Sequence, residues 1–195
     1  MKRLLDIVSS SIVLILLSPL WLVIALLIVC ESRGGVFYRQ IRVGKDNRDF
    51  YLYKFRTMRP DSDKKGLLTV GERDSRVTRV GYFLRKYKLD EFPQLINVLK
   101  GDMSIVGPRP EVRKYVDMYT PEQMRVLSVR PGLTDLASIQ YVHENELLAA
   151  SDNPEQTYID QVMPAKLQLN LQYIDNQSLS GDIKLIFQTF AAILH

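Results

Sequence analysis

The sequence holds one cysteine and two histidines in 195 residues, a scarcity that excludes a disulfide-bonded scaffold and a histidine-rich metal-binding pattern. With Cys30 alone the chain forms no internal disulfide bond, which fits a reducing compartment. His143 and His195 stand far apart and give no histidine-rich metal-binding pattern. Internal repeats and low-complexity tracts are also absent, so nothing in the pattern indicates a repeat architecture.

Positive charge is in modest excess, and it is unevenly distributed. The net charge is +4, but residues 1–60 hold ten Lys and Arg against four Asp and Glu, and the remainder holds sixteen against eighteen. A basic end beside an apolar segment indicates attraction to an anionic membrane face. Nucleic-acid binding is the competing interpretation of an isoelectric point near 9.1. We expect membrane lipids, and not nucleic acid, as the partner of this basic end.

The N-terminal segment from Ile7 to Cys30 contains no charged residue. As a straight helix it would measure about 36 Å, enough to cross the roughly 30 Å of bilayer hydrocarbon. Ser18 and Pro19 stand at its middle, where proline removes a helical hydrogen bond and kinks the helix. The hydroxyl of Ser18 is expected to satisfy the carbonyl that is freed.

Basic residues flank this apolar segment on both sides. Lys2 and Arg3 precede it, and the residues that follow it include Arg33, Arg39, Arg42, Lys45 and Arg48. The positive-inside tendency favours a cytoplasmic position for both ends, which a broken, re-entrant helix meets and a span does not. From the residues alone, a kinked transmembrane helix remains an equal alternative.

The centre of the chain carries two adjacent carboxylates, Asp90 and Glu91, in front of a helical pattern. Apolar residues recur at helical spacing after them, Pro93 fits a first turn, and Gly101 supplies a stop. Adjacent helical residues point about 100° apart, so the two carboxylates are predicted to hold different roles. Ordinary helix capping is the structural alternative for this pair.

Five cationic residues are candidates for binding phosphate. Lys54 and Arg56 are predicted to project from one face of a strand over residues 49–58 and to grip a pyrophosphate. Arg85 precedes the carboxylates, and Arg109 sits between two prolines that fix its backbone for bidentate binding. Arg130 lies in a turn before Pro131 and Gly132 and is a further candidate. A solvated surface charge is the structural alternative for each.

The remaining pattern predicts short elements and one loop. Residues 37–43 predict a short strand or an amphipathic surface piece that ends at Gly44. A loop is expected from Asp61 to Arg79, with a lid over a nucleotide as one alternative. Residues 120–123 and 153–156 each predict a helix start, and a helix from the second should break or restart at Pro164. Residues 183–194 predict an apolar helix too short to span, in the core or at the bilayer interface.

The stretch LRKYKLDEFPQLINVLKGDMSIVGPRPE, with FYLYKFRTM at 50–58 and RPGLT at 130–134, resembles the signature of the bacterial sugar transferases. The resemblance covers nearly the whole chain and is to their small, monotopic form. It favours the re-entrant helix over the span. It implies an α+β, mainly helical fold with a kinked re-entrant membrane helix (1–32), a small cytoplasmic catalytic domain (33–195) and interfacial amphipathic helices.

The resemblance also implies a reaction at the bacterial inner membrane. A UDP-sugar would donate a sugar phosphate to a polyprenol phosphate, expected to be undecaprenyl phosphate, through a covalent intermediate on Asp90. Mg²⁺ is the implied cofactor, with Asp90 as its ligand, and Glu91 would assist the metal or move a proton. The sugar and the oligomeric state, a homodimer being one alternative, stay open. A non-catalytic membrane-bound adaptor and a phosphohydrolase using the same carboxylates are the rival functions.

Overall fold

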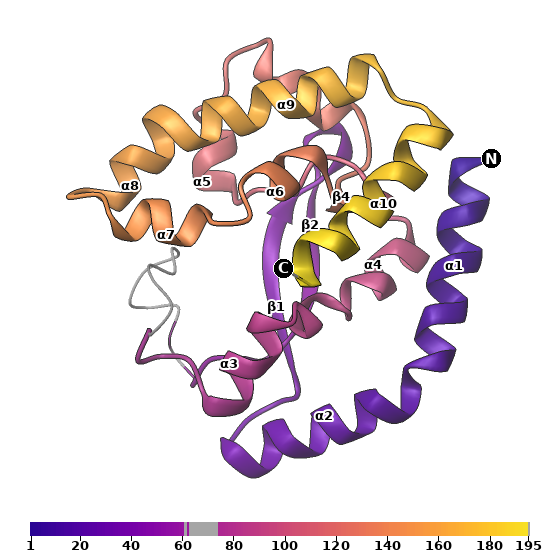
Figure 1. The fold of residues 1–195 in the computed structure, drawn as a ribbon, viewed down its shortest axis with the longest axis vertical. Helices are drawn as coiled ribbons and strands as arrows, with labels where there is room; N and C mark the ends of the chain where they lie inside the picture. Colours follow the sequence, from indigo (N-terminus) through magenta and orange to yellow (C-terminus); the bar gives the residue numbers. More distant parts are fainter. Residues whose placement is uncertain (61, 63–73, 195) are drawn as a thin grey trace.

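The computed structural model describes residues 1–60, 62 and 74–194, a mixed structure that is mainly helical, as predicted. Its α-helices are α1 (Lys2–Leu16), α2 (Ser18–Glu31), α3 (Arg79–Lys86), α4 (Gln94–Lys100), α5 (Arg113–Val116), α6 (Leu136–Gln140), α7 (Glu144–Ala149), α8 (Pro154–Thr157), α9 (Met163–Asp175) and α10 (Leu179–Leu194). Its strands are β1 (Phe37–Val43), β2 (Asp49–Phe55), β3 (Ser104–Val106) and β4 (Gly132–Thr134). The helices surround the long β1–β2 hairpin, and α1 and α2 form an outer arm (Figure 1).

The β1–β2 hairpin is antiparallel and keeps the predicted strand ranges closely. Asp46 and Asn47 close it with φ of 57° and 59°, a left-handed conformation that these two residue types tolerate. Tyr38 lies opposite Lys54 and Arg42 lies opposite Phe50, and directly opposed residues share a face of a sheet. One face of the hairpin therefore carries the polar residues that matter below.

The N-terminal helices α1 and α2 meet at Leu17 with a bend of 62°. The Ser18 hydroxyl donates to the Ile15 carbonyl at 2.8 Å, the group that Pro19, without an N–H, leaves free. Among the described helices none is both long and apolar enough to cross a membrane by itself, whereas α1 and α2 taken together would be. The break lies directly before the Ser-Pro pair.

The first two turns of α1 are tied to the rest of the molecule. The Arg3 guanidinium donates to carbonyl oxygens in the last turn of α4, at 2.6 Å to Val98. The buried Asp6 carboxylate accepts from the Ser104 hydroxyl at 2.8 Å and from the Ile105 N–H at 3.2 Å, both in β3. α1 thus contacts both α4, the helix after Asp90 and Glu91, and β3, the strand before Arg109.

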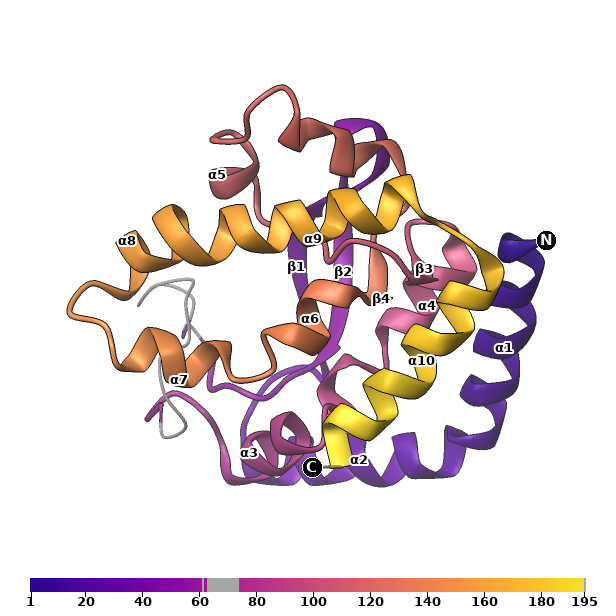
Figure 2. The same cartoon turned by 45° about the horizontal axis from the view of Figure 1, so that its top comes forward.

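The far end of α2 is tied to the same body. Glu31, the last residue of α2, accepts hydrogen bonds from the backbone N–H groups of Arg79 at 2.7 Å and Val80 at 2.8 Å. These are unpaired donors at the N-terminus of α3, where a carboxylate is favourable. Both ends of the α1–α2 arm therefore rest on one folded unit, as the two views also show (Figure 2).

The predicted helix beginning at Asp90 begins later in the structure. Leu89–Glu91 form a separate 3₁₀ turn, and α4 begins at Gln94 with Pro93 as its N-cap residue. Lys88 has a left-handed φ of 55° and Pro93 lacks an N–H, so the backbone between them cannot continue a regular α-helix. Gly101, at φ 94°, ends α4 as predicted.

The C-terminal half follows its capping signals with two differences. The predicted capping box forms: the Thr120 hydroxyl accepts from the Gln123 backbone N–H, and the Gln123 side-chain oxygen accepts from the Thr120 backbone N–H. The residues that follow, Gln123–Ser128, form a 3₁₀ helix and not an α-helix. Asn153 caps α8, after which a π-helical turn (Tyr158–Val162) precedes α9, so the helix restarts near Pro164 as expected. The loop predicted over 61–79 lies mostly outside the described residues.

Candidate active site

Asp90 lies on the wall of a cavity of about 650 Å³ between the hairpin, α6, α9 and α10. The residue is 6% exposed, and no described residue hydrogen-bonds to its carboxylate. Burial raises the pKa of Asp90; Lys54 and Arg85 oppose the rise and Glu91 adds to it. A buried carboxylate without a hydrogen-bonded partner is poorly stabilised as an anion, which makes it reactive toward an electrophile.

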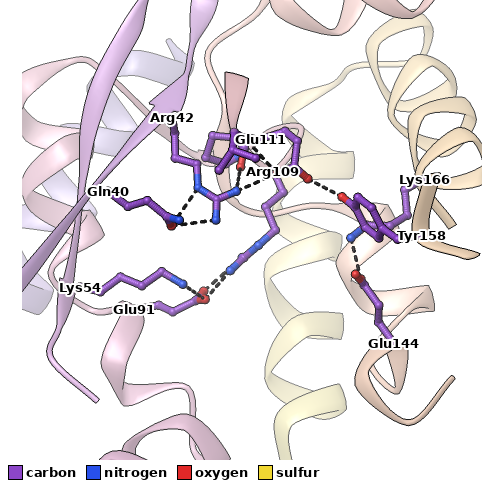
Figure 3. A network of polar contacts seen from close by, with 11 residues as sticks. Gln40, Arg42, Lys54, Glu91, Arg109, Glu111, Glu144, Tyr158 and Lys166 are labelled. Carbon is purple, nitrogen blue, oxygen red and sulfur yellow. Dashed lines mark hydrogen bonds and ion pairs between the residues drawn. The ribbon is translucent and has the colours of Figure 1, made fainter. Parts of the chain in front are cut away.

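Glu91, its neighbour, is held by two cations. Lys54 of β2 donates to Glu91 at 3.0 Å, and Arg109 donates to both carboxylate oxygens, at 3.1 Å to Oε2 (Figure 3). Burial alone would raise the pKa of Glu91, but Arg109 and Lys54 outweigh burial and hold it well below its usual range. Glu91 in turn raises the pKa of Arg109. Glu91 is therefore a permanent anion between two cations.

The loop after β3 presents Arg109 in a fixed position. The Arg109 N–H donates to the buried Asp135 carboxylate at 2.8 Å, and the Gly107 N–H donates to the Thr134 carbonyl at 3.0 Å. A side chain at Gly107 would meet the Arg130 carbonyl oxygen at 2.5 Å, so this close approach of two loops requires glycine. Rigid backbone on both sides gives the guanidinium a defined direction.

Arg85 brings a third cation to the cavity near Asp90. Its Nε donates to the Thr57 hydroxyl at 2.9 Å, and burial lowers its pKa while Asp90 opposes the change. The described lining of the cavity holds nine Lys and Arg against four Asp and Glu, an excess of five positive charges. Such a surplus suits a phosphate-bearing ligand.

Arg56 lies one residue beyond the end of β2 at Phe55, and it lines the same cavity as Lys54. Its guanidinium donates to the carbonyl oxygens of Ser32 and Arg33, each at 2.7 Å, just beyond the C-terminus of α2. These carbonyls carry the negative end of the helix dipole, which a cation stabilises. The Arg56 guanidinium is therefore occupied by backbone carbonyls, and the joint grip of Lys54 and Arg56 on one pyrophosphate stays a prediction.

Arg130 was predicted as a phosphate ligand, and the structure places it elsewhere. Its Nε donates to the Gly101 carbonyl at 2.9 Å, after the end of α4, and it does not line the cavity. Arg130 therefore links the backbone just before β4 to the turn that follows α4. The structure assigns no turn to Arg130 and Pro131, and the sequence pattern did not show which way the arginine points.

A second polar cluster went unnoticed in the sequence. Arg42 donates to Glu111 at 2.9 Å and to Gln40 at 2.8 Å, and the Tyr158 hydroxyl donates to the other oxygen of Glu111 (Figure 3). Alternation along β1 places Gln40 and Arg42 on the face that carries Lys54, so the period of two could have revealed them. The cluster extends the polar wall of the cavity toward α9.

The described residues contain no group of three or more metal-ligand side chains. Asp90 is the carboxylate left without a hydrogen bond at the cavity, because Glu91 is occupied by Lys54 and Arg109. Mg²⁺ is commonly held by one or two carboxylates together with substrate phosphate oxygens. The donor set therefore fits a Mg²⁺ ion that binds with a phosphorylated substrate and does not form a closed protein site.

The chain belongs to the bacterial sugar transferase family, whose model matches residues 1–195. A UDP-N-acetylgalactosamine-undecaprenyl-phosphate N-acetylgalactosaminephosphotransferase of Aeromonas hydrophila is 43% identical over 99% of this chain and 43% of its own length. A UDP-glucose:undecaprenyl-phosphate glucose-1-phosphate transferase of Caulobacter vibrioides is 37% identical over 99% of this chain and 69% of its own. The uncharacterized sugar transferase EpsL of Bacillus subtilis is 37% identical over 100% of this chain and 87% of its own length. The chain thus spans less than half of the Aeromonas protein.

Proposed function

We propose that the chain transfers a sugar 1-phosphate from a UDP-sugar to a polyprenyl phosphate, undecaprenyl phosphate in bacteria, and releases UMP. The observation that carries the proposal is Asp90, a buried carboxylate with a raised pKa and no hydrogen bond, facing a cation-lined cavity. The cavity volume lies within the roughly 300–1,000 Å³ typical of small-molecule sites. The activities named for the Aeromonas and Caulobacter relatives support the same reaction.

In the first half of the reaction an Asp90 oxygen attacks the phosphorus that bears the sugar. The bond from that phosphorus to the bridging oxygen breaks, and UMP leaves with the electron pair. An aspartyl phosphosugar remains on the enzyme. In the second half a phosphate oxygen of the polyprenyl phosphate attacks the same phosphorus, which frees the Asp90 carboxylate and yields the polyprenyl diphosphate sugar.

Neither half requires a proton to be moved, since the nucleophiles and the leaving groups are anions. The lowered pKa of Glu91 agrees with this, because a permanent carboxylate is a poor proton donor at neutral pH. Glu91 instead orients Lys54 and Arg109 toward the phosphoryl group, where their charge offsets the repulsion between anions. Mg²⁺, held by Asp90 and the diphosphate, would supply further charge neutralisation when bound.

The α1–α2 arm places this reaction at the bilayer in our proposal, as a re-entrant segment of the bacterial inner membrane. Support comes from the two ends of the arm, which both rest on the folded body at Arg3 and at Glu31. The arm also exposes apolar side chains along its length: Leu4, Val8, Ile12, Ile15, Leu16, Leu22, Val23, Leu26 and Val29. With basic residues at both ends, the catalytic body would lie on the cytoplasmic face.

The test offers detergent-purified protein a labelled UDP-sugar and Mg²⁺ without any lipid acceptor. A stoichiometric burst of UMP should appear, with sugar phosphate bound to the protein. The adduct should be labile to hydroxylamine, map to Asp90 and pass to undecaprenyl phosphate when the lipid is added. Asp90→Asn should form no adduct, and Glu91→Gln, which leaves the nucleophile in place, should form it slowly.

Three other outcomes would replace the proposal. UMP release that always requires the lipid, without an adduct, indicates direct transfer, with Asp90 as a metal ligand only. Continuous release of free sugar phosphate without lipid indicates a phosphohydrolase. Binding of anionic lipid that ignores Asp90, with no UMP from any UDP-sugar, indicates a non-catalytic adaptor.

A further inference from the structure

The cavity has a second wall, formed by α9, across from the cationic residues. Met163, Lys166, Leu167 and Asn170 all line the cavity, and their spacing of three and four residues puts them on one face of the helix. Figure 3 shows Lys166 with Tyr158 on the side of the network away from Lys54 and Glu91, with Arg109 between them. A ligand whose charged end binds the cations would therefore extend toward the α9 face.

Asn170 is the residue of this face that points to a ligand. Asn170 is buried, with 5% of its surface exposed, yet its Oδ1 has no hydrogen-bond partner among the described residues. Buried amide groups are nearly always paired, because an unpaired one forfeits its hydration without compensation. Oδ1 itself is enclosed, but Asn170 lines the cavity, so a polar, uncharged ligand group that reached its amide would supply the missing hydrogen bond.

The neighbours of Asn170 define the chemistry of that group. Lys166, one turn away, pairs with Glu144 of α7 at 2.7 Å, so the face presents donors and acceptors without a net charge. The Tyr158 ring packs against Tyr115 at 4.9 Å between ring centres, and the Lys166 ammonium lies over the Tyr158 ring at 6.0 Å from its centre. Because Tyr115 and Lys166 already lie against the Tyr158 ring, that ring is a poor platform for stacking a nucleobase.

We propose that the α9 face, with Asn170 at its centre, binds the hydroxyl or acylamino groups of the donor's sugar and so discriminates between UDP-sugars. The proposal rests on the proposed function. Paired donors and acceptors without net charge match the hydroxyl groups of a hexose, whereas the cationic wall matches the diphosphate. The sugar phosphate stays on Asp90 after UMP departs, so the α9 face would hold the sugar through both halves of the reaction.

The test compares Asn170→Ala with the wild-type protein, full-length in detergent with Mg²⁺ and undecaprenyl phosphate. The value of kcat/KM from UMP release is measured for UDP-glucose, UDP-galactose, UDP-N-acetylglucosamine and UDP-N-acetylgalactosamine. The ratio between preferred and disfavoured donors should change by about 3- to 10-fold, the effect of one hydrogen bond between neutral groups. The inhibition constant of UMP, which has no sugar, should stay within about twofold, which also shows that the variant is folded.

Two further variants sharpen the result. Glu144→Gln, on a different helix, should alter the same donor ratios, because it changes the partner of Lys166. Asn176→Ala is the matched control: it removes an exposed amide just after α9 that contacts the Gln172 carbonyl and does not line the cavity. Its donor ratios should equal those of the wild-type protein.

Each other outcome overturns the proposal in a distinct way. Equal loss for every donor together with weaker UMP inhibition assigns the face to the nucleoside. Unchanged donor ratios in Asn170→Ala with an active wild-type protein make Asn170 a packing residue and leave the proposed function intact. A wild-type protein that releases no UMP from any UDP-sugar removes the proposed function, and the sugar subsite with it.

Discussion

Asp90 and Glu91 are adjacent in sequence, yet their surroundings move their pKa values in opposite directions. Burial without a hydrogen bond raises the pKa of Asp90, whereas Arg109 and Lys54 overcome burial and lower that of Glu91. The first carboxylate is left reactive and the second is fixed as a counter-ion. Two identical kinds of group can therefore hold different roles within one 3₁₀ turn.

The raised pKa of Asp90 predicts that Asp90→Asn stabilises the protein while abolishing transfer. The folded state binds a proton at Asp90 more tightly than the unfolded state, so the ionised group costs folding free energy above its raised pKa. The gain in Asp90→Asn, about 1 kcal/mol, should be complete above the raised pKa and vanish as the pH falls below the ordinary value of 3.8. Melting temperatures between pH 4 and pH 8 measure this.

Glu91→Gln is the control with the opposite sign. Its depressed pKa means that ionised Glu91 stabilises the fold above its unfolded value of 4.5, and that this stability is lost as the pH falls through the lowered pKa. Removing one partner of a buried ion pair costs about 3–5 kcal/mol, so this variant should melt lower at neutral pH. A lower melting temperature for Asp90→Asn at pH 8 would contradict the account of Asp90.

At the scale of elements, the first two turns of α1 connect the segments that carry the catalytic groups. Asp6 holds β3, which leads directly into the loop that presents Arg109. Asp6→Asn, which keeps one acceptor and loses the other, should lower kcat/KM for the UDP-sugar by about 10-fold, through misplacement of Arg109. Ser9→Ala, on the same helix but bonded only within it, should have no effect.

A double-mutant cycle distinguishes positioning from stability. Arg109→Lys keeps the charge and loses the planar fork that contacts both oxygens of Glu91, so it should also cost about 10-fold. If Asp6 acts through Arg109, the double variant should be little worse than either single variant. Fully additive losses would limit Asp6 to holding the helix in place.

Signals within single segments, such as helix caps and breaks, predicted many of the elements. The sequence did not reveal the contacts between distant segments. Gly101, Asn153 and the Ser18–Pro19 break act on their own backbone, so the sequence states their effect directly. The target of Arg56 is a carbonyl beyond α2, more than twenty residues away, and no periodicity encodes it. The same limit explains why Arg130 was misplaced.

The site was predictable only in part for the same reason. Asp90, Glu91 and Arg109 lie in one continuous motif, whereas Asn170 became visible only when α9 was placed across the cavity. The sequence predicted different roles for Asp90 and Glu91, but it did not show that Lys54 and Arg109 pair with Glu91. A motif identifies chemical groups, and the tertiary structure decides which of them remain available.

At the scale of the whole molecule, the arm formed by α1 and α2 predicts a topology. Single cysteines at Lys2 and Arg33, in a Cys30→Ser background, should both react with a membrane-impermeant reagent from the cytoplasmic side, because both ends rest on one body. Replacing Ser18 and Pro19 by Leu and Ala removes the break and should shift the helix toward spanning. Reaction of position 2 only from the periplasmic side would contradict the re-entrant arrangement.

Lys2 of α1 forms an ion pair with the buried Asp182 of α10, and this contact has a consequence for biosynthesis. The two residues are 180 positions apart, and the partner of Arg3 in α4 is 95 positions away. During synthesis α1 exists long before either partner, so it stays without these contacts while the residues up to Asp182 are made. The arrangement of the candidate site is therefore completed only when nearly all of these residues have been synthesised.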